Sequence, residues 1–80
     1  MAAKSSKKTA YIVQPFWRDG KGLLAGQAKR IEDEQKALRE GELMASRNAG
    51  VTVTAFEYDT ACDYWGEPVL IATHGDVPEA

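Results

Sequence analysis

Hydrophobic and polar residues alternate most clearly in the segment 51–58. The valines and the alanine occupy one parity of this segment, and the threonines and large aromatic residues occupy the other. The first set is Val51, Val53 and Ala55, and the second is Thr52, Thr54, Phe56 and Tyr58. Because successive side chains of a strand point to opposite faces, the segment predicts a strand with small residues on one face and aromatic residues on the other.

A hairpin is predicted ahead of this strand. The segment 10–17 is rich in β-branched and aromatic residues, which favours a strand. Asp19-Gly20 follows, and Asp-Gly between two apolar runs is typical of a tight turn that requires a positive φ. We expect the second strand over 22–27. The competing interpretation is a helix that reaches back to Leu23.

Two residues of this hairpin restrict how it enters a sheet. Pro15 has no backbone N–H, so the first strand should lie at a sheet edge or turn Pro15 outward. Gly26 lies in a stretch of weak β propensity, and glycine inside a strand pattern is typical of a bulge.

A helix is predicted over 33–49. Asp33 is a suitable N-cap, and Gly50 fits the left-handed position that closes a helix. One face of this helix consists mainly of small residues: Ala37, Leu38, Gly41, Met44, Ala45 and Ala49. Gly41 in its centre indicates a very close approach to the sheet, whereas Leu43 lies off the stripe and is expected to be exposed.

A final apolar strand is predicted over 68–74. The order of elements then defines an α+β domain in which a single four-stranded antiparallel sheet (ββαββ) carries one helix on one face. We expect a disordered basic tail over 1–9, a single domain over 10–77 and a flexible C-terminus over 78–80.

Composition limits the architecture and the location. The chain has 80 residues, of which 44% are hydrophobic and 28% charged, enough for one small core. No segment approaches the roughly 18 consecutive apolar residues of a membrane span. No hydrophobic stretch follows the Lys/Ser-rich start, so we expect no secretory signal, no membrane contact and a cytoplasmic protein.

Charge is distributed unevenly along the chain. Residues 1–30 contain seven Lys or Arg residues and one acidic residue, whereas residues 51–80 contain six acidic residues and no Lys or Arg. Such asymmetry is typical of a basic surface for nucleic acid or of an acidic surface for a basic partner. The alternative is that the two ends lie side by side and neutralise each other.

Catalytic chemistry has little support. The one cysteine, Cys62, lies between acidic residues that disfavour a thiolate, and with one histidine, His74, no zinc cage can form from one chain. Asp59, Asp63 and Glu67 recur every four residues, but they lack the glycine turn of a calcium loop. Gly20-Lys21-Gly22 lacks the spacing of a phosphate-binding loop. We expect no enzymatic activity, no cofactor and no metal.

Four short motifs carry a resemblance to known sequences. They are Tyr11-Ile-Val-Gln-Pro-Phe16, Ala37-Leu-Arg39 leading to Ala49-Gly-Val51, Gly66-Glu-Pro68, and Gly75-Asp-Val-Pro78. Together they resemble a group of small uncharacterised bacterial proteins of ββαββ order, over roughly residues 10–79. The chain departs from that pattern at Leu43, Trp17 and Trp65. The resemblance implies a fold and no activity.

The aromatic residues exceed what the small-residue helix face can cover. They are Tyr11, Phe16, Trp17, Phe56, Tyr58, Tyr64 and Trp65. Aromatic residues on an open sheet face are typical of an interface. We therefore expect a protein-interaction or regulatory domain that forms a homodimer through the open face, with Phe56 and Tyr58 at the centre and Trp17 or Trp65 at the border.

A nucleic-acid-binding module is the alternative. Cations beside an aromatic residue are typical of surfaces that bind single strands. The candidate cations are Lys4, Lys7 and Lys8 in the tail and Arg18 and Lys21 in the first hairpin, next to Trp17. The acidic C-terminal part of the chain opposes this alternative.

Overall fold

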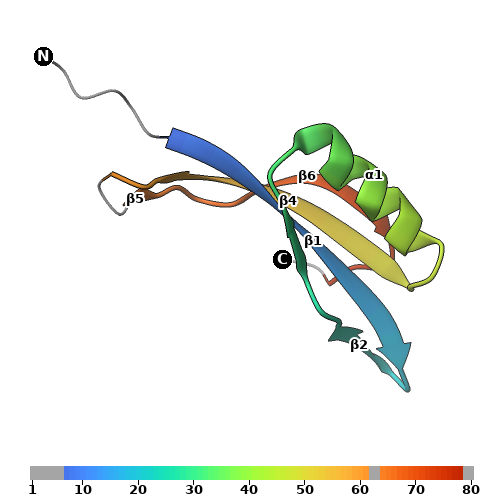
Figure 1. Cartoon of the computed structure of the whole chain (residues 1–80). Coiled ribbons are helices and arrows are strands. Elements are labelled where there is room, and N and C mark those ends of the chain that lie inside the picture. Colours follow the sequence, from blue (N-terminus) through green and yellow to red (C-terminus); the bar gives the residue numbers. More distant parts are fainter. Residues whose placement is uncertain (1–6, 62–63, 79–80) are drawn as a thin grey trace, which may run out of the picture.

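A single antiparallel sheet with one helix across one face forms the protein (Figure 1). The computed structural model describes residues 7–61 and 64–78. The elements are β1 (Lys7–Asp19), β2 (Gly22–Ala25), β3 (Lys29–Ile31), α1 (Glu34–Ala45), β4 (Gly50–Asp59), β5 (Tyr64–Trp65) and β6 (Val69–Gly75). β1 and β4 pair at the centre, β2 and β3 flank β1, and β5 and β6 flank β4. The predicted α+β class is confirmed.

Six strands replace the predicted four, because both outer strands are interrupted and their pieces β3 and β5 lie outside the predicted segments. Phe16 pairs with Ala25 and Val13 pairs with Lys29, so two residues of β1 face the three residues 26–28. The extra residue is a β-bulge that ends β2 within the predicted 22–27 strand, and β3 lies beyond the predicted segment. The bulge expected at Gly26 is thus confirmed, and the helix considered as an alternative from Leu23 is wrong.

The second outer strand is interrupted in a similar way. β5 and β6 are separated by 66–68, and Gly66 donates its backbone N–H to the carbonyl of Glu57 at 2.8 Å. Gly26 donates in the same manner to Pro15, at 2.9 Å. Each interruption therefore begins with a glycine bonded to the adjacent central strand. A further register shift inside β6 leaves Ile71 without a partner in the β4 ladder.

Pro15 is buried in a central strand, so both expected arrangements, an edge position and an outward-turned Pro15, are wrong. β1 has β4 on one side and β2 and β3 on the other. The Pro15 carbonyl accepts from Gly26, and in an antiparallel ladder the N and O of one residue face the same neighbour. The missing N–H thus faces the bulge, where the ladder is already interrupted. A bulge is one of the few places at which a sheet accepts proline.

The helix is shorter than predicted. Its predicted N-terminal cap is confirmed, but its predicted C-terminal end is wrong. Asp33 caps α1 as expected, because its side chain accepts the backbone N–H of Lys36 at 2.9 Å. The C-terminal prediction is wrong: α1 ends at Ala45 with Ser46 as the cap, and Gly50 begins β4. Gly50 serves a different purpose, since a Cβ there would overlap the carbonyl oxygen of Asp76.

The core lies between α1 and the centre of the sheet and is built from small side chains. Among the described residues, Val13, Ala37, Val51 and Val53 form this buried cluster, whereas Ala10, which is also buried, pairs with Phe56 on the other face of the sheet. Leu38, Met44 and Ala45 of α1 pack against this cluster from the predicted helix face. Leu43 is 54% exposed, as expected.

Large parts of the sheet remain uncovered. α1 has 12 residues and is about 18 Å long, whereas β1 has 13 residues and is about 43 Å long. The β1–β2 and β4–β5 hairpins project beyond the helix at opposite ends of the molecule (Figure 1). Among the described residues, no helix is long and apolar enough to span a membrane.

The basic and acidic parts of the chain lie side by side. β1 begins at Lys7, so residues 7–9, which we assigned to the tail, are in the sheet. Lys7 pairs with Asp59 in the β1–β4 ladder, and Arg18 forms an ion pair with Asp76 at 2.5 Å. Opposite charges from the two ends of the chain therefore meet at both ends of β1.

Candidate functional site: an aromatic cluster on the open sheet face

The two faces of the sheet differ as the alternation predicts. Val51 and Val53 belong to the core under α1. Residues directly opposite in an antiparallel ladder share a face, so the pairs Ile12–Thr54 and Ala10–Phe56 lie on the other side, which we call the open face.

Three large aromatic residues meet on the open face near the β4–β5 hairpin. The Trp65 ring stacks on Phe56 and on Tyr58, with centroid distances of 5.7 and 5.8 Å. Tyr58 pairs with Trp65 in the β4–β5 ladder, which brings the two rings to the same face. We call Phe56, Tyr58 and Trp65 the aromatic cluster. Trp65 is 63% exposed, so a large part of the cluster faces solvent.

An ion pair from the β3–α1 connection borders the aromatic cluster. The guanidinium of Arg30 lies 4.9 Å from the centroid of the Tyr58 ring and 5.9 Å from that of Phe56. Arg30 donates to Glu32 at 2.9 Å, and the hydroxyl of Tyr58 donates to the same carboxylate at 3.1 Å. The hydrogen bond from Arg30, supported by that from Tyr58, lowers the pKa of Glu32 below its ordinary value of 4.5.

A groove of about 650 Å³ runs along the open face beside the aromatic cluster. The floor consists of residues from the two central strands, and the wall consists of aromatic and loop residues. The lining residues are Ile12, Gln14, Thr52, Thr54, Phe56, Trp65, Gly66 and Pro68. None of them carries a charge. The Gln14 amide donates to the carbonyl of Gly26 at 2.6 Å, so this donor is already satisfied.

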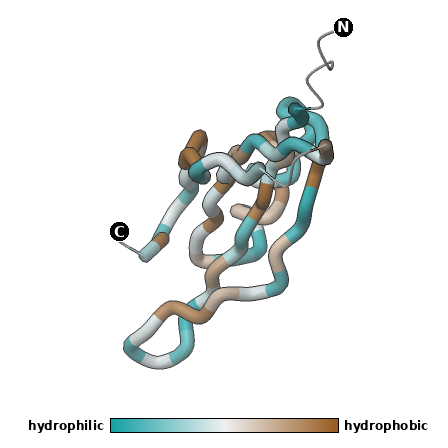
Figure 2. The backbone as a smooth tube through the Cα atoms, turned by 90° about the vertical axis from the view of Figure 1, so that its left-hand side faces the viewer, coloured by the Kyte–Doolittle hydropathy of each residue, from teal (hydrophilic) through white to brown (hydrophobic). Residues whose placement is uncertain are grey.

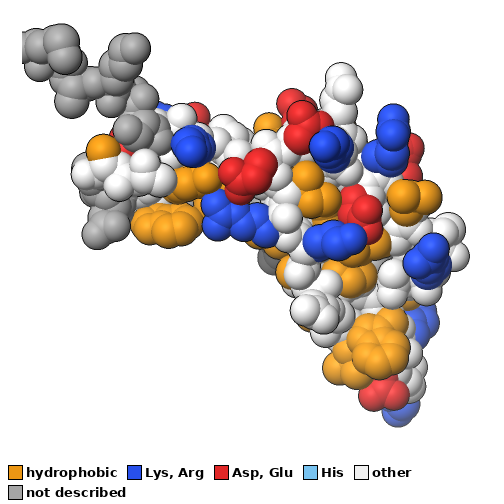
Figure 3. Space-filling view, viewed as in Figure 1, with side chains coloured by type: hydrophobic (Ala, Val, Ile, Leu, Met, Phe, Trp, Pro, Cys, Tyr) orange, Lys and Arg blue, Asp and Glu red, His pale blue; other side chains and the backbone are white. Residues whose placement is uncertain are grey.

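Trp17 does not join the aromatic cluster. It pairs with Leu24 in the hairpin at the other end of β1 and has the parity of Val13, on the helix side of the sheet. Figure 3 shows hydrophobic side chains gathered at both ends of the molecule, with charged side chains between them. Of the two tryptophans expected at the border of the interface, the structure brings only Trp65 to Phe56 and Tyr58.

The basic residues of the nucleic-acid alternative are also separated. Lys8 pairs with Tyr58, and the ammonium of Lys7 lies 5.5 Å from the centroid of the Tyr64 ring. Arg18 lies ten residues further along β1, about 33 Å away in an extended strand. Lys21 lies in the turn beyond it, and Lys4 is outside the described residues. Lys7 and Lys8 therefore do not form one basic surface with the cations of the first hairpin.

The residues considered for catalysis are not brought into one site. His74 is half-buried beside Gly41 of α1 and pairs with Val51. The Asp59 carboxylate accepts the backbone N–H of Ala61 at 2.8 Å, which is a turn contact. In the stretches 7–61 and 64–78, no three His, Cys, Asp or Glu side chains lie together as metal ligands would. Cys62 and Asp63 are outside those stretches.

Two further exposed surfaces were not anticipated. Leu70 and Ile71 are exposed on β6, whose outer edge pairs with no strand in the described part of the chain. Figure 2 shows this hydrophobic stretch on the strand that leads to the C-terminus. The other surface is a cleft between β3 and α1. Leu43, which lines this cleft, is the residue by which the sequence could have indicated it, because it is an apolar residue outside the core-facing stripe of the helix.

Fold and site together define a small α+β protein with an aromatic cluster on an uncovered antiparallel sheet. No protein-family model, no curated protein and no solved structure matches the chain. The resemblance to small bacterial proteins of ββαββ order therefore stays a prediction, and function has to be inferred from the surfaces alone.

Proposed function

We propose that this protein is a non-enzymatic interaction domain that self-associates through the open face, with the aromatic cluster at the centre of the interface. The observation that carries the proposal is that the buried side chains are small, whereas several of the largest side chains are exposed. In the described part of the chain the five buried hydrophobic residues are alanines and valines, whereas Trp17, Tyr64 and Trp65 are among the exposed ones. A small single core is marginal, and association is one common way to complete it.

The occupant we propose for the open-face groove is a second copy of the chain. Because no residue that lines the groove is charged, two copies facing each other bring no like charges together there. The nearby cation Arg30 is already paired with Glu32. Each large side chain removed from water contributes roughly 1.5–3 kcal/mol.

Binding of single-stranded nucleic acid is the second candidate. It is supported by the exposed aromatic cluster together with Lys7 and Lys8 at the same end of β1. Stacking on aromatic residues and contacts from cations are what such binding requires. The uncharged groove and the ion pair of Arg30 favour the protein partner.

Sedimentation velocity over a concentration series tests the proposal with two exposed tryptophans. Trp65→Glu should shift the protein from dimer to monomer, and so should Phe56→Glu. Trp17→Glu is the matched control, because Trp17 is 55% exposed at the opposite end of the sheet, and it should leave the dimer unchanged. Circular dichroism establishes that each variant is folded.

Two results would overturn the proposal. One is a wild-type protein that remains monomeric at every accessible concentration, and the other is dissociation by Trp17→Glu but not by Trp65→Glu. Binding of a single-stranded oligonucleotide that weakens steeply with salt and is lost in Trp65→Glu and Lys8→Glu would replace it with the nucleic-acid function.

A further inference from the structure

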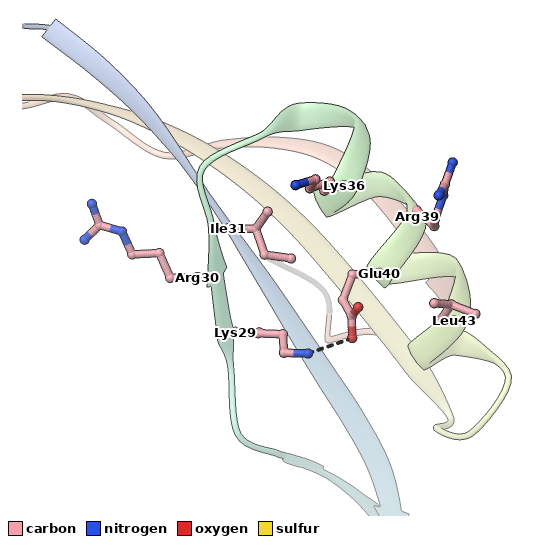
Figure 4. Close-up of a pocket in the computed structure, with 7 residues that line it drawn as sticks. All are labelled: Lys29, Arg30, Ile31, Lys36, Arg39, Glu40 and Leu43. Carbon is pink, nitrogen blue, oxygen red and sulfur yellow. Dashed lines mark hydrogen bonds and ion pairs between the residues drawn. The ribbon is translucent and has the colours of Figure 1, made fainter.

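A cleft of about 330 Å³ separates the edge strand β3 from α1. We call it the β3–α1 cleft. In Figure 4, Ile31 projects from β3 toward the helix, and Leu43 lies at the lower end of the helix. Ile31 is half-buried, and Leu43 is 54% exposed. They are the two apolar side chains that line the cleft, and Glu40 lies between them in Figure 4. The volume lies at the lower end of the range for ligand pockets, about 300–1,000 Å³.

Cations line the cleft, although the whole chain has a net charge of −2. Lys29 crosses it and bonds Glu40 at 3.1 Å, so this pair cancels (Figure 4). Arg30 points away from the helix and is paired with Glu32. Lys36 and Arg39 line the cleft from α1, and neither has an ion pair among residues 7–61 and 64–78. The cleft therefore presents two uncompensated positive charges beside two apolar side chains, Ile31 and Leu43.

We propose that the β3–α1 cleft binds an extended acidic segment of a partner protein. Its aliphatic side chains pack on Ile31 and on Leu43, and its carboxylates meet Lys36 and Arg39. Charge complementarity favours an anionic occupant, and the apolar side chains Ile31 and Leu43 favour a peptide over a nucleic acid, because they offer nothing to a phosphate backbone. The proposal does not depend on self-association through the open face.

The probe is a blocked pentapeptide of alternating aspartate and leucine, titrated into the ¹⁵N-labelled full chain. Amide shifts are expected for Lys29–Ile31 and for the helix residues 36–43, and not for the aromatic cluster. The peptide with asparagine in place of aspartate should bind at least about tenfold more weakly, because it loses the charge contacts.

Charge reversal locates the contacts. Lys36→Glu and Arg39→Glu should each weaken binding about tenfold, whereas the control Arg47→Glu, an exposed cation beyond the end of α1, should change it less than about twofold. The proposal is overturned by an absence of shifts at millimolar peptide, by equal binding of the asparagine peptide, or by equal weakening in Arg47→Glu. It is also overturned if Arg39→Glu changes the oligomeric state, because the occupant is then a second copy.

Discussion

Gly41 of α1 lies so close to Val53 of β4 that a methyl group on the glycine would come within 2.8 Å of Cγ2 of the valine. That distance is shorter than contacts of real Cβ atoms. The helix backbone therefore rests directly on the side chain of Val53, with no side chain of the helix in between, and the small residues on its inner face are a requirement of that approach.

The substitution Gly41→Ala tests this contact. On an exposed helix face the change would stabilise the protein by about 1 kcal/mol. Here overpacking against Val53 should cost about 1–3 kcal/mol, so we expect a net loss of about 1 kcal/mol in the free energy of unfolding by urea. Glu42→Ala, at the next and exposed position, should stay within about 0.5 kcal/mol. A more stable Gly41→Ala variant would contradict the close approach.

Two strand glycines should respond differently to the same substitution. A Cβ on Gly50 would overlap the carbonyl oxygen of Asp76, whose N–H is bonded to Ala49 at 2.9 Å. We expect Gly50→Ala to lose about 2 kcal/mol or more, seen as a lower melting temperature. Gly22 has nothing within 4 Å of an added Cβ, so Gly22→Ala should be neutral or slightly stabilising. Equal melting temperatures for the two variants would show that Asp76 yields to the added methyl.

Removal of the helix cap should weaken α1. Asp33 accepts the backbone N–H of Lys36, so Asp33→Ala is expected to cost about 1 kcal/mol in thermal or urea unfolding. Asp33→Asn keeps an acceptor oxygen and should retain most of that stability. A cost as large in Asp33→Asn as in Asp33→Ala would mean that the charge, rather than the hydrogen bond, is responsible.

Acid should weaken the contacts of Glu32. Its pKa is lowered in the folded state by the hydrogen bonds from Arg30 and Tyr58. A lowered folded-state pKa contributes stability above the unfolded value near 4.5, and that stability is lost as pH falls through the folded value. An NMR titration of the carboxyl carbon should give a midpoint below 4.5, and Arg30→Ala should raise it. A midpoint that Arg30→Ala leaves unchanged would refute the assignment of the cause.

Local patterns were sufficient for much of the fold. The alternation over 51–58 separates the two faces correctly, and Asp19-Gly20 forms the predicted turn, with φ +62° at Gly20. Asp33 caps the helix, because its hydrogen bond spans only three residues of chain. Each of these features depends on residues close together in sequence, which is why the sequence alone indicated them.

Features that depend on distant residues were missed or misassigned. Pro15 lies in a central strand because a bulge begins at Gly26, eleven positions away. Gly50 was interpreted as a helix terminator, but the residue that requires it is Asp76. The contact of Arg30 with Tyr58 depends on the register of three strands. None of these relationships has a local signature in the sequence.

The central β1–β4 ladder also determines how the chain has to fold. The pair closest in sequence along it, Phe16 with Gly50, already spans β2, β3 and the whole of α1. Loop-closure entropy must be overcome before such contacts form, so folding should be slow for a chain of this size. Neither the N-terminal nor the C-terminal half of the chain should be stable on its own. During synthesis, β1 has to wait for β4 to emerge from the ribosome, with the edges of its hairpin available to another nascent chain meanwhile.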